Sequence, residues 1–485
     1  MITATQAPES YLAAFEELNK RGAQPAWLRS LRQEAFGHFC QTGFPTTHDE
    51  DWRFTNVSAI AKTPFGLAHN GHKGLTTKDL EPFRILDFPC RLVFVNGRFV
   101  PGLSQISSLP QGVKVGSLAE ELARNPQELE PHLARHFKFG RDAFSALNTS
   151  FFEDGAVIRI PRGVVLEQPV YLLFVSNEQK PVMTSPRNLI VAEESSQATV
   201  VEDYVSLGGA SNGDAGSAAF SNTATELIAG ANAVVSHYMV VREDRKTFNV
   251  STLQLHQERS ANVSSHSLLL GGAIVRNNVH PVLAGEGSEC LINGLFIGNG
   301  RQHIDNYMLV EHASPHCDSR QFYNGILGGR SHGVFHGRII VHKDAQKTDA
   351  KQTNRNILLS DDAQIDTKPQ LEIYADDVKC THGATIGKIE ENALFYARSR
   401  GMDEESARRM LLLAFANESL DRMNPGPLRD HLETLVTESL LATVQAGGKH
   451  GQGEEGDAQI GTGSHGAGKE EDERRDEGRR WEEIG

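Results

Sequence analysis

The chain has 485 residues, of which 39% are hydrophobic and 23% are charged, and its formal net charge is −14. A chain of this length can bury a large core and is expected to form two or three structural units. The negative charge argues against a general nucleic-acid-binding protein, because phosphate contacts need clustered Lys and Arg. No apolar run reaches the length of a membrane span, and the first ten residues lack the basic start of an export signal, so we expect a cytoplasmic protein that binds no membrane.

The cysteines are odd in number and include no C-x-x-C pair, which fits reduced thiols better than a disulfide framework. They are Cys40, Cys90, Cys290, Cys317 and Cys380. A self-contained metal site built from four cysteines is therefore not expected.

Residues 1–147 are expected to form a helical module that carries one β-hairpin. Apolar residues recur at helical spacing after Pro25, a residue favoured near helix starts. Asn96 and Gly97 lie between two runs of β-forming residues, and an Asn-Gly pair in this position is a strong hairpin signal.

Residues 148–386 are dominated by short runs rich in Val, Ile, Leu and Thr, separated by Gly and polar turns. These runs predict strands without intervening helices. A strand-only stretch of this length is large for a sandwich, which favours a repeating architecture.

An acidic turn residue begins three of these predicted strands, at Asp344, Asp362 and Asp377. The intervals are 18 residues (362 − 344) and 15 residues (377 − 362). We interpret this spacing as one rung of a β-solenoid, in which each coil buries its apolar face only by stacking on its neighbours. In this register two pairs of positions are equivalent, Cys380 with Ile365 and His382 with Thr367.

Residues 387–446 are expected to form a second helical module. Asp403 is a suitable N-cap for its first long helix, and Pro427 stands in the first turn of the next. One face of the first helix is predicted to carry Ala407, Met410, Leu411 and Ala414. Residues 447–485 are rich in Gly and charge with almost no apolar content, which predicts a disordered tail.

Cys380 and His382 stand two residues apart on a predicted strand, so their side chains point to the same face. A thiol and an imidazole on one face could converge on a metal or sulfur atom, or on a partner surface. The alternative is a small buried thiol and a hydrogen-bonded histidine at the last rung of the solenoid.

Three other patterns are weaker. The pairs Asp361-Asp362 and Asp376-Asp377 resemble paired catalytic carboxylates, but Asp is also favoured in turns because it bonds its own backbone. The run Gly383–Ile389 lacks the spacing of a phosphate loop. A group of histidines and one cysteine matches no zinc pattern, so we interpret it as mostly structural: His312, His316, Cys317, His332, His336 and His342.

The segment "DAQKTDAKQTNRNILLSDDAQIDTKPQLEIYADDVKCTHGATIG", followed by "LFYARSRGMDEESARRMLLLAF", closely resembles the SufB/SufD family of iron–sulfur cluster assembly proteins. Within this family the chain resembles SufD more than SufB. "DEDWRFTNVSAI" (49–60) is similar to the SufD N-terminal motif, and Gly383 follows the histidine where SufB-like chains carry a glutamate.

The resemblance implies a right-handed parallel β-helix flanked by helical modules, a paired SufB subunit and a SufC ABC-type ATPase. It implies that His382 lies at the SufB–SufD interface and faces a SufB cysteine where a nascent iron–sulfur cluster forms, with Cys380 on the same face. The helices from Asp403 to Val444 match the region that docks SufC, with Met410, Leu411 and Leu412 as candidate contacts. The apolar faces of these helices could equally pack only on the end of the solenoid, so the sequence does not identify which side chains reach the ATPase.

The sequence therefore predicts a non-enzymatic subunit of a SufBCD scaffold. Two alternatives stay open, a β-helix carbohydrate-active enzyme that uses the acidic turns and an interaction scaffold without metal chemistry. A flavin bound by the whole complex and a homodimer of this chain are further open points.

Overall fold

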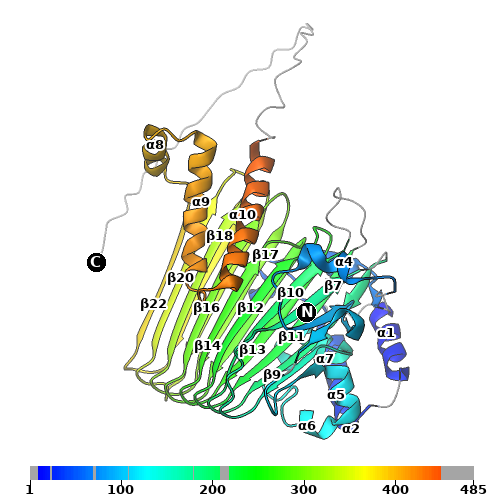
Figure 1. Ribbon diagram of the computed structural model, residues 1–485. Coiled ribbons are helices and arrows are strands. Elements are labelled where there is room, and N and C mark those ends of the chain that lie inside the picture. The colour runs from blue at the N-terminus through cyan, green and yellow to red at the C-terminus, as the bar shows by residue number, and fades with distance from the viewer. Residues whose placement is uncertain are drawn as a thin grey trace, which may run out of the picture.

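The computed structural model describes residues 9–21, 24–68, 73–107, 109–177, 180–207 and 218–448. Within these residues, successive strands alternate between two sheets of eleven strands each, and the long strands of each sheet run parallel. A chain that alternates between two sheets and advances one level with each return is a parallel β-helix (Figure 1). The predicted fold, a β-helix flanked by helical modules, is confirmed.

Sheet A takes the odd-numbered long strands and sheet B the even-numbered ones. Sheet A contains β1 (Gly66–Leu67), β5 (Lys114–Ser117), β6 (Ala156–Ile160), β8 (Val182–Thr184), β9 (Arg187–Ala192), β11 (Ala219–Ala229), β13 (Phe248–Gln257), β15 (Ile274–Leu283), β17 (His303–His312), β19 (His332–Val341) and β21 (Gln364–Ile373). Sheet B contains β2 (Cys90–Val95), β3 (Arg98–Phe99), β4 (Gln105–Ile106), β7 (Val170–Ser176), β10 (Gln197–Ser206), β12 (Val234–Arg242), β14 (Asn262–Leu269), β16 (Glu289–Gly298), β18 (Asp318–Leu327), β20 (Asp349–Leu358) and β22 (Lys379–Gly387).

The helices flank the two sheets. They are α1 (Glu9–Lys20), α2 (Ala26–Thr42), α3 (Ser58–Lys62), α4 (Thr77–Leu80), α5 (Leu118–Arg124), α6 (Pro126–Leu129), α7 (Ala143–Phe151), α8 (Glu391–Ser399), α9 (Glu404–Leu420) and α10 (Pro427–Gly448), with short 3₁₀ turns at η1 (Glu50–Trp52), η2 (Glu81–Phe83), η3 (Pro101–Leu103) and η4 (Phe139–Arg141). None of the helices in this part of the chain is long and apolar enough to cross a membrane.

The repeat length predicted from the acidic turns is wrong by a factor of two. Asp349 of β20 pairs with Lys379 of β22, so a full turn takes 30 residues (379 − 349) and the 15- and 18-residue spacing marks half a turn. Cys380 accordingly pairs with Ala350 and not with Ile365, which lies in the other sheet. The error arises because both half-turns begin with the same kind of acidic turn, so the sequence does not show to which sheet the next strand belongs.

The interior of the β-helix is packed by residues that alternate along every strand with residues facing outward. Aromatic rings stack on successive levels of sheet B, with ring centroids 4.9 Å apart for Phe94 and Phe174 and 4.8 Å apart for Phe174 and Tyr204. Each coil thus shields its neighbour, which is how a solenoid obtains a continuous core.

The predicted hairpin is confirmed, and its first strand also belongs to the β-helix. Phe94 pairs with Phe99 in antiparallel fashion across a turn in which Asn96 and Gly97 have φ of 51° and 75°, as a two-residue type I′ turn requires. Its first strand, β2, continues sheet B by pairing in parallel with β7. Sheet A likewise ends in the antiparallel pair of β5 and β6.

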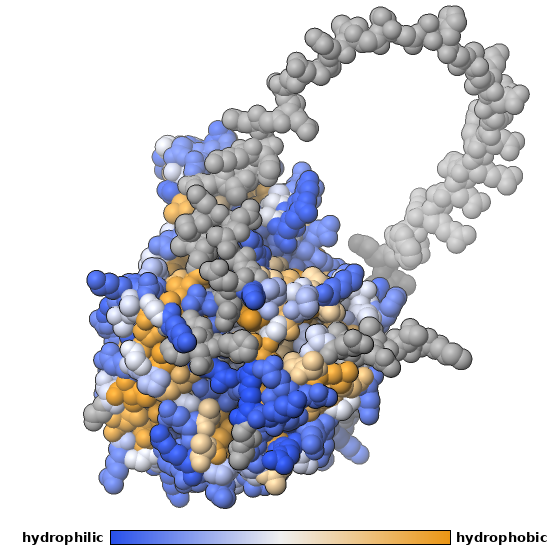
Figure 2. Space-filling model, turned by 90° about the vertical axis from the view of Figure 1, so that its right-hand side faces the viewer, coloured by the Kyte–Doolittle hydropathy of each residue, from blue (hydrophilic) through white to orange (hydrophobic). Residues whose placement is uncertain are grey.

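The N-terminal helices pack on the outer face of sheet A. In helix α7, Asn148 donates hydrogen bonds of 3.0 and 2.7 Å to the carbonyls of Pro186 and Asn222. Figure 2 views the molecule from this side and shows hydrophobic patches divided by hydrophilic residues. Within the described residues, apolar side chains of α1, α2 and α7 pack in one cluster with Met183, Phe220 and Val250 of sheet A.

The C-terminal helices α9 and α10 lie on the outer face of sheet B (Figure 1). Asp403 caps α9 as predicted, because its carboxylate accepts a 2.9 Å hydrogen bond from the backbone N–H of Ser406. The predicted apolar face of α9 is wrong apart from Ala407, since the buried side chains are Ala407, Leu412, Phe415, Ala416, Ser419 and Leu420. Residues 449–485, most of the segment expected to be disordered, lie outside the described residues.

Candidate functional site

Cys380 and His382 lie on β22, the last strand of sheet B, and point toward the interior of the β-helix. They pair with Ala350 and Gln352 of β20, which are both buried inside the solenoid. Residues paired in register on two parallel strands point to the same face of the sheet. Cys380 and His382 therefore point inward, as Ala350 and Gln352 do. The structure therefore brings together the two residues that the sequence singled out.

The end of the β-helix at β22 is open. Within the described residues no further strand pairs with the outer edge of β22 or with that of β21, its counterpart in sheet A. His382 is exposed, and so are the apolar side chains of Ile373 and Tyr374, at the end of β21, and of Ile386 on β22. An unpaired edge beside exposed apolar side chains is a template for a strand from another chain.

The Cys380 thiol is half-buried against Ala350 and Asp349. Partial burial raises the pKa of this thiol, the carboxylate of Asp349 raises it further, and a backbone hydrogen bond with Ala350 acts in the opposite direction. A raised pKa keeps the thiol protonated at neutral pH, whereas a metal or sulfur ligand must be a thiolate. Binding to Cys380 therefore requires an incoming cation or partner that offsets the loss of the proton.

Two glutamines form a ladder directly beneath His382. The Gln352 side chain donates a 3.0 Å hydrogen bond from Nε2 to Oε1 of Gln321, one level deeper. Gln352 Oε1 and Gln321 Nε2 are buried and have no hydrogen-bond partner within the described residues. An unpaired carbonyl oxygen on the adjacent rung can accept a hydrogen bond from one ring nitrogen of His382 and so fix its tautomer. Sequence reasoning missed this ladder, and the signal that finds it is the full-turn spacing.

The ligand set at the open end is incomplete. A thiolate and an imidazole are ligands suited to iron, but two protein ligands do not satisfy a transition metal. No cluster of three or more His, Cys, Asp and Glu suited to a metal ion occurs in the part of the chain that the structure describes. Any metal or cluster held at His382 therefore needs donors from another molecule.

The other patterns singled out in the sequence do not gather into a site. Asp361 and Asp362 lie in an exposed turn, where Lys388 Nζ contacts Asp361 at 2.7 Å and Arg330 contacts Asp362 at 3.4 Å. Among the histidines, His312 bonds Ser319 at 2.8 Å inside the solenoid. His332 and His336 lie instead on the outward face of β19 in sheet A, and His342 directly follows that strand. The turn interpretation of the aspartates is thus confirmed.

The three candidate ATPase contacts differ in exposure. The side chain of Met410 is 43% exposed and Leu411 is half-buried, but Leu412 is only 1% exposed and packs in the core between α9 and sheet B. Leu412 is therefore corrected to an internal packing residue. The larger exposed apolar side chains are those of Phe395 and Tyr396 on α8, at 74% and 60%. The sequence held a signal for them, because adjacent apolar residues on a short helix cannot all face inward.

Comparisons with known proteins show the family of the chain. Residues 174–415 match the family model described as "SUF system FeS cluster assembly, SufBD core domain", and residues 5–172 match "SufBD protein N-terminal region". A protein of Synechocystis named as an iron-sulfur cluster assembly SufBD family protein is 32% identical over 439 residues, which cover 90% of this chain and 96% of that protein.

Two further relatives cover a similar span. The iron-sulfur cluster assembly protein SufD of Escherichia coli is 31% identical over 411 residues, or 84% of this chain and 92% of that protein. The chloroplastic protein ABCI7 of Arabidopsis thaliana is 29% identical and covers 84% of this chain and 85% of that protein. The chain belongs to the SufBD family of iron–sulfur cluster assembly proteins and is a homologue of SufD.

Proposed function

We propose that this chain is the SufD-like subunit of a cytoplasmic SufBCD scaffold and that a SufB-type β-helix pairs with it at the open end. The single observation that carries the proposal is the incomplete ligand pair, Cys380 and His382, on an unpaired edge strand. A second β-helix at this edge would cover the exposed apolar side chains and supply the missing donors.

The nascent iron–sulfur cluster is the cargo of this interface. His382 would bind iron as a neutral imidazole while SufB provides a thiolate, and Gln352 beneath it would hold the ring orientation. Cys380 would join as a second ligand once the incoming iron or a partner group displaces its proton. The chain itself would be a non-catalytic scaffold, since ATP hydrolysis belongs to SufC.

The SufC ATPase would dock on the exposed apolar side chains of the C-terminal module. Phe395, Tyr396 and Met410 supply such a surface on α8 and α9, whereas Leu412 anchors α9 to sheet B. Because α8 follows β22 directly, motion of the docked ATPase would reach the edge strand that carries His382.

The test is affinity purification of the full chain from its host, followed by mass spectrometry and by assay of iron and sulfide in the recovered complex. We expect recovery of an ABC-type ATPase and a second β-helix protein, and loss of iron and sulfide in His382→Ala. The matched control is Thr381→Ala, an exposed neighbour on the opposite face of β22.

Two outcomes would contradict the proposal in different places. Recovery of the chain only as a homodimer or monomer would refute the SufB and SufC assignment. An intact complex whose iron and sulfide content is the same in His382→Ala and in the wild type would indicate an interaction scaffold without metal chemistry.

A further inference from the structure

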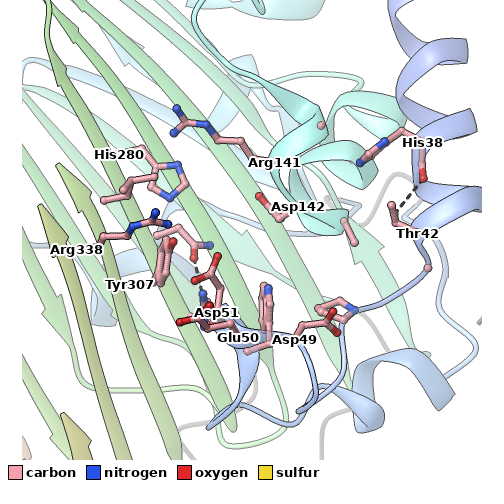
Figure 3. A pocket seen from close by; sticks show the side chains of 18 residues that line it. His38, Thr42, Asp49, Glu50, Asp51, Arg141, Asp142, His280, Tyr307 and Arg338 are labelled. Carbon is pink, nitrogen blue, oxygen red and sulfur yellow. Dashed lines mark hydrogen bonds between the residues drawn. The ribbon is translucent and has the colours of Figure 1, made fainter. Parts of the chain in front are cut away.

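A cavity of about 580 Å³ lies on the outer face of sheet A (Figure 3), and His382 is not among the residues that line it. Its floor is formed by side chains of β15, β17 and β19, among them His280, Tyr307 and Arg338. The opposite wall is formed by residues 49–52, from the N-terminal motif, and by residues 140–143. The volume lies in the range of sites for small organic ligands.

His280 brings an unpartnered polar atom to this cavity. Its side chain points from the sheet toward Arg141 and Asp142 in Figure 3, the residue is only 5% exposed, and its Nε2 has no hydrogen-bond partner within the described residues. Burial, with the charges of Arg141 and Arg276, lowers the pKa of His280 to about 3, so the ring is neutral at physiological pH. A buried donor or acceptor without a partner is unfavourable, and a ligand would relieve that penalty.

Two arginines, Arg141 and Arg276, line the cavity together with His280. Arg141 contacts Glu311 at 2.5 Å, and its guanidinium carries five N–H donors, more than one carboxylate can use. Arg276 is more fully engaged, because it contacts Asp305 at 2.5 Å and donates to Asn278 Oδ1 at 2.9 Å and to the backbone carbonyl of Asp51 at 2.8 Å. Arg276 is also held in place by the rings of Trp52 and Tyr307, at 4.0 and 4.8 Å from their centroids. Arg141 and neutral His280 therefore line the same cavity, and each can direct an N–H group to a ligand there.

The carboxylates at the mouth are mostly engaged in the fold. Asp49 accepts a 2.7 Å hydrogen bond from the backbone N–H of Thr46, and Glu50 pairs with Lys368 at 2.8 Å. Asp142 caps α7 through bonds of 2.9 Å from backbone N–H groups. An anion therefore meets donors at His280 and acidic groups near the mouth, which favours a ligand with an anionic head and a neutral or cationic remainder.

We propose that this cavity binds a small organic ligand through an oxyanionic head group, a carboxylate or a phosphate, that accepts hydrogen bonds from His280 Nε2 and from Arg141. The site would be independent of the cluster interface, because its residues lie on the outer face of sheet A. It also gives a role to the first four residues of the 49–60 motif, which line the cavity opposite the sheet.

The test is isothermal titration calorimetry of the full chain with malonate and with inorganic phosphate as head-group probes. We expect one of them to bind with an affinity on the order of 1 mM, and His280→Phe to weaken that binding at least about tenfold. The matched control is His336→Phe. His336 is also buried on the outer face of sheet A with an unpartnered Nε2, but it does not line the cavity, so its loss should leave binding unchanged.

The two probes separate the two head groups, since binding of malonate alone assigns a carboxylate and binding of phosphate alone assigns a phosphate. Arg141→Gln provides a second variant if His280→Phe does not fold, because Arg141 is partly exposed, and it should weaken binding in the same direction. Failure of the wild type to bind either probe would overturn the proposal, and so would equal affinities in the wild type and the cavity variants.

Discussion

Glu243 is a buried carboxyl group whose titration should control the stability of the β-helix near neutral pH. It follows β12, is 3% exposed and accepts hydrogen bonds of 2.8 Å from Ser221 Oγ and 2.7 Å from Asn249 Nδ2. Burial raises the pKa of Glu243 to about 7, the nearby charge of Asp244 adds to the rise, and the hydrogen bonds only partly oppose it.

The sign of the effect follows from the two pKa values. In the unfolded chain Glu243 loses its proton near the ordinary value of 4.5, whereas in the folded chain it keeps the proton until about pH 7. The folded state therefore loses stability relative to the unfolded state as the pH rises from about 4.5 to about 7, and the full penalty is present above pH 7. A shift of this size corresponds to about 3 kcal/mol.

Glu243→Gln removes the titration and can keep the hydrogen bonds. The amide oxygen can accept from Asn249, and the amide N–H can donate to Ser221, whose hydroxyl can rotate to accept it. Compared with the wild type, the variant should gain about 2–3 kcal/mol more free energy of unfolding at pH 8 than at pH 5.

The assay is urea denaturation of both proteins at the two pH values, with Glu289→Gln as the control because Glu289 is exposed on β16. The control should show the same difference from the wild type at pH 5 and pH 8. If Glu243→Gln behaved like the control, the carboxylate of Glu243 would be stabilised in the folded state and the reasoning from burial would be refuted.

Three further predictions concern packing and the open edge. Leu412→Ala should lower the free energy of unfolding by about 2–5 kcal/mol by urea denaturation, because the side chain is buried, whereas Met410→Ala should leave it nearly unchanged and weaken ATPase binding in a pull-down. Gly294→Ala should cost about 1–3 kcal/mol in the same assay, because a Cβ there would lie 2.1 Å from the ring of Tyr323; an unchanged stability would show that the ring can move. Ala384→Lys, on the inward face of exposed β22, should leave stability unchanged but abolish association with a second β-helix on size-exclusion chromatography, and persistence of the complex would place the interface elsewhere.

Features that depend on local chemistry could be predicted from the sequence. The hairpin at Asn96 and Gly97 follows from two residues that accept positive φ, and the start of α9 follows from the carboxylate of Asp403. The shared face of Cys380 and His382 follows from the period of two along a strand. In each case the signal and the structure lie within a few residues of each other.

Features that depend on distant segments could not be predicted in this way. The spacing of the acidic turns does not distinguish a half-turn from a full turn, because the turns are alike in both sheets, and the pairing of Asp349 with Lys379 gives the full-turn length. The buried face of α9 depends on where the helix meets sheet B, so Leu412 and Met410 could not be told apart by helical period alone. The cavity at His280 joins residues more than 200 positions apart, and no local pattern predicts that contact.

One end of the β-helix is closed and the other is open, and this difference limits how the protein can assemble. At the N-terminal end each sheet finishes in antiparallel pairing, between β2 and β3 in sheet B and between β5 and β6 in sheet A. At the other end the outer edges of β21 and β22 are unpaired within the described residues.

A solenoid open at both ends could add copies head to tail without limit, which is the geometry of a filament. With one end closed, pairing through the open end joins two open ends to each other and stops at two solenoids. A second copy or a related β-helix fits this end equally well by backbone pairing, so the choice between them depends on the side chains that each brings to the edge.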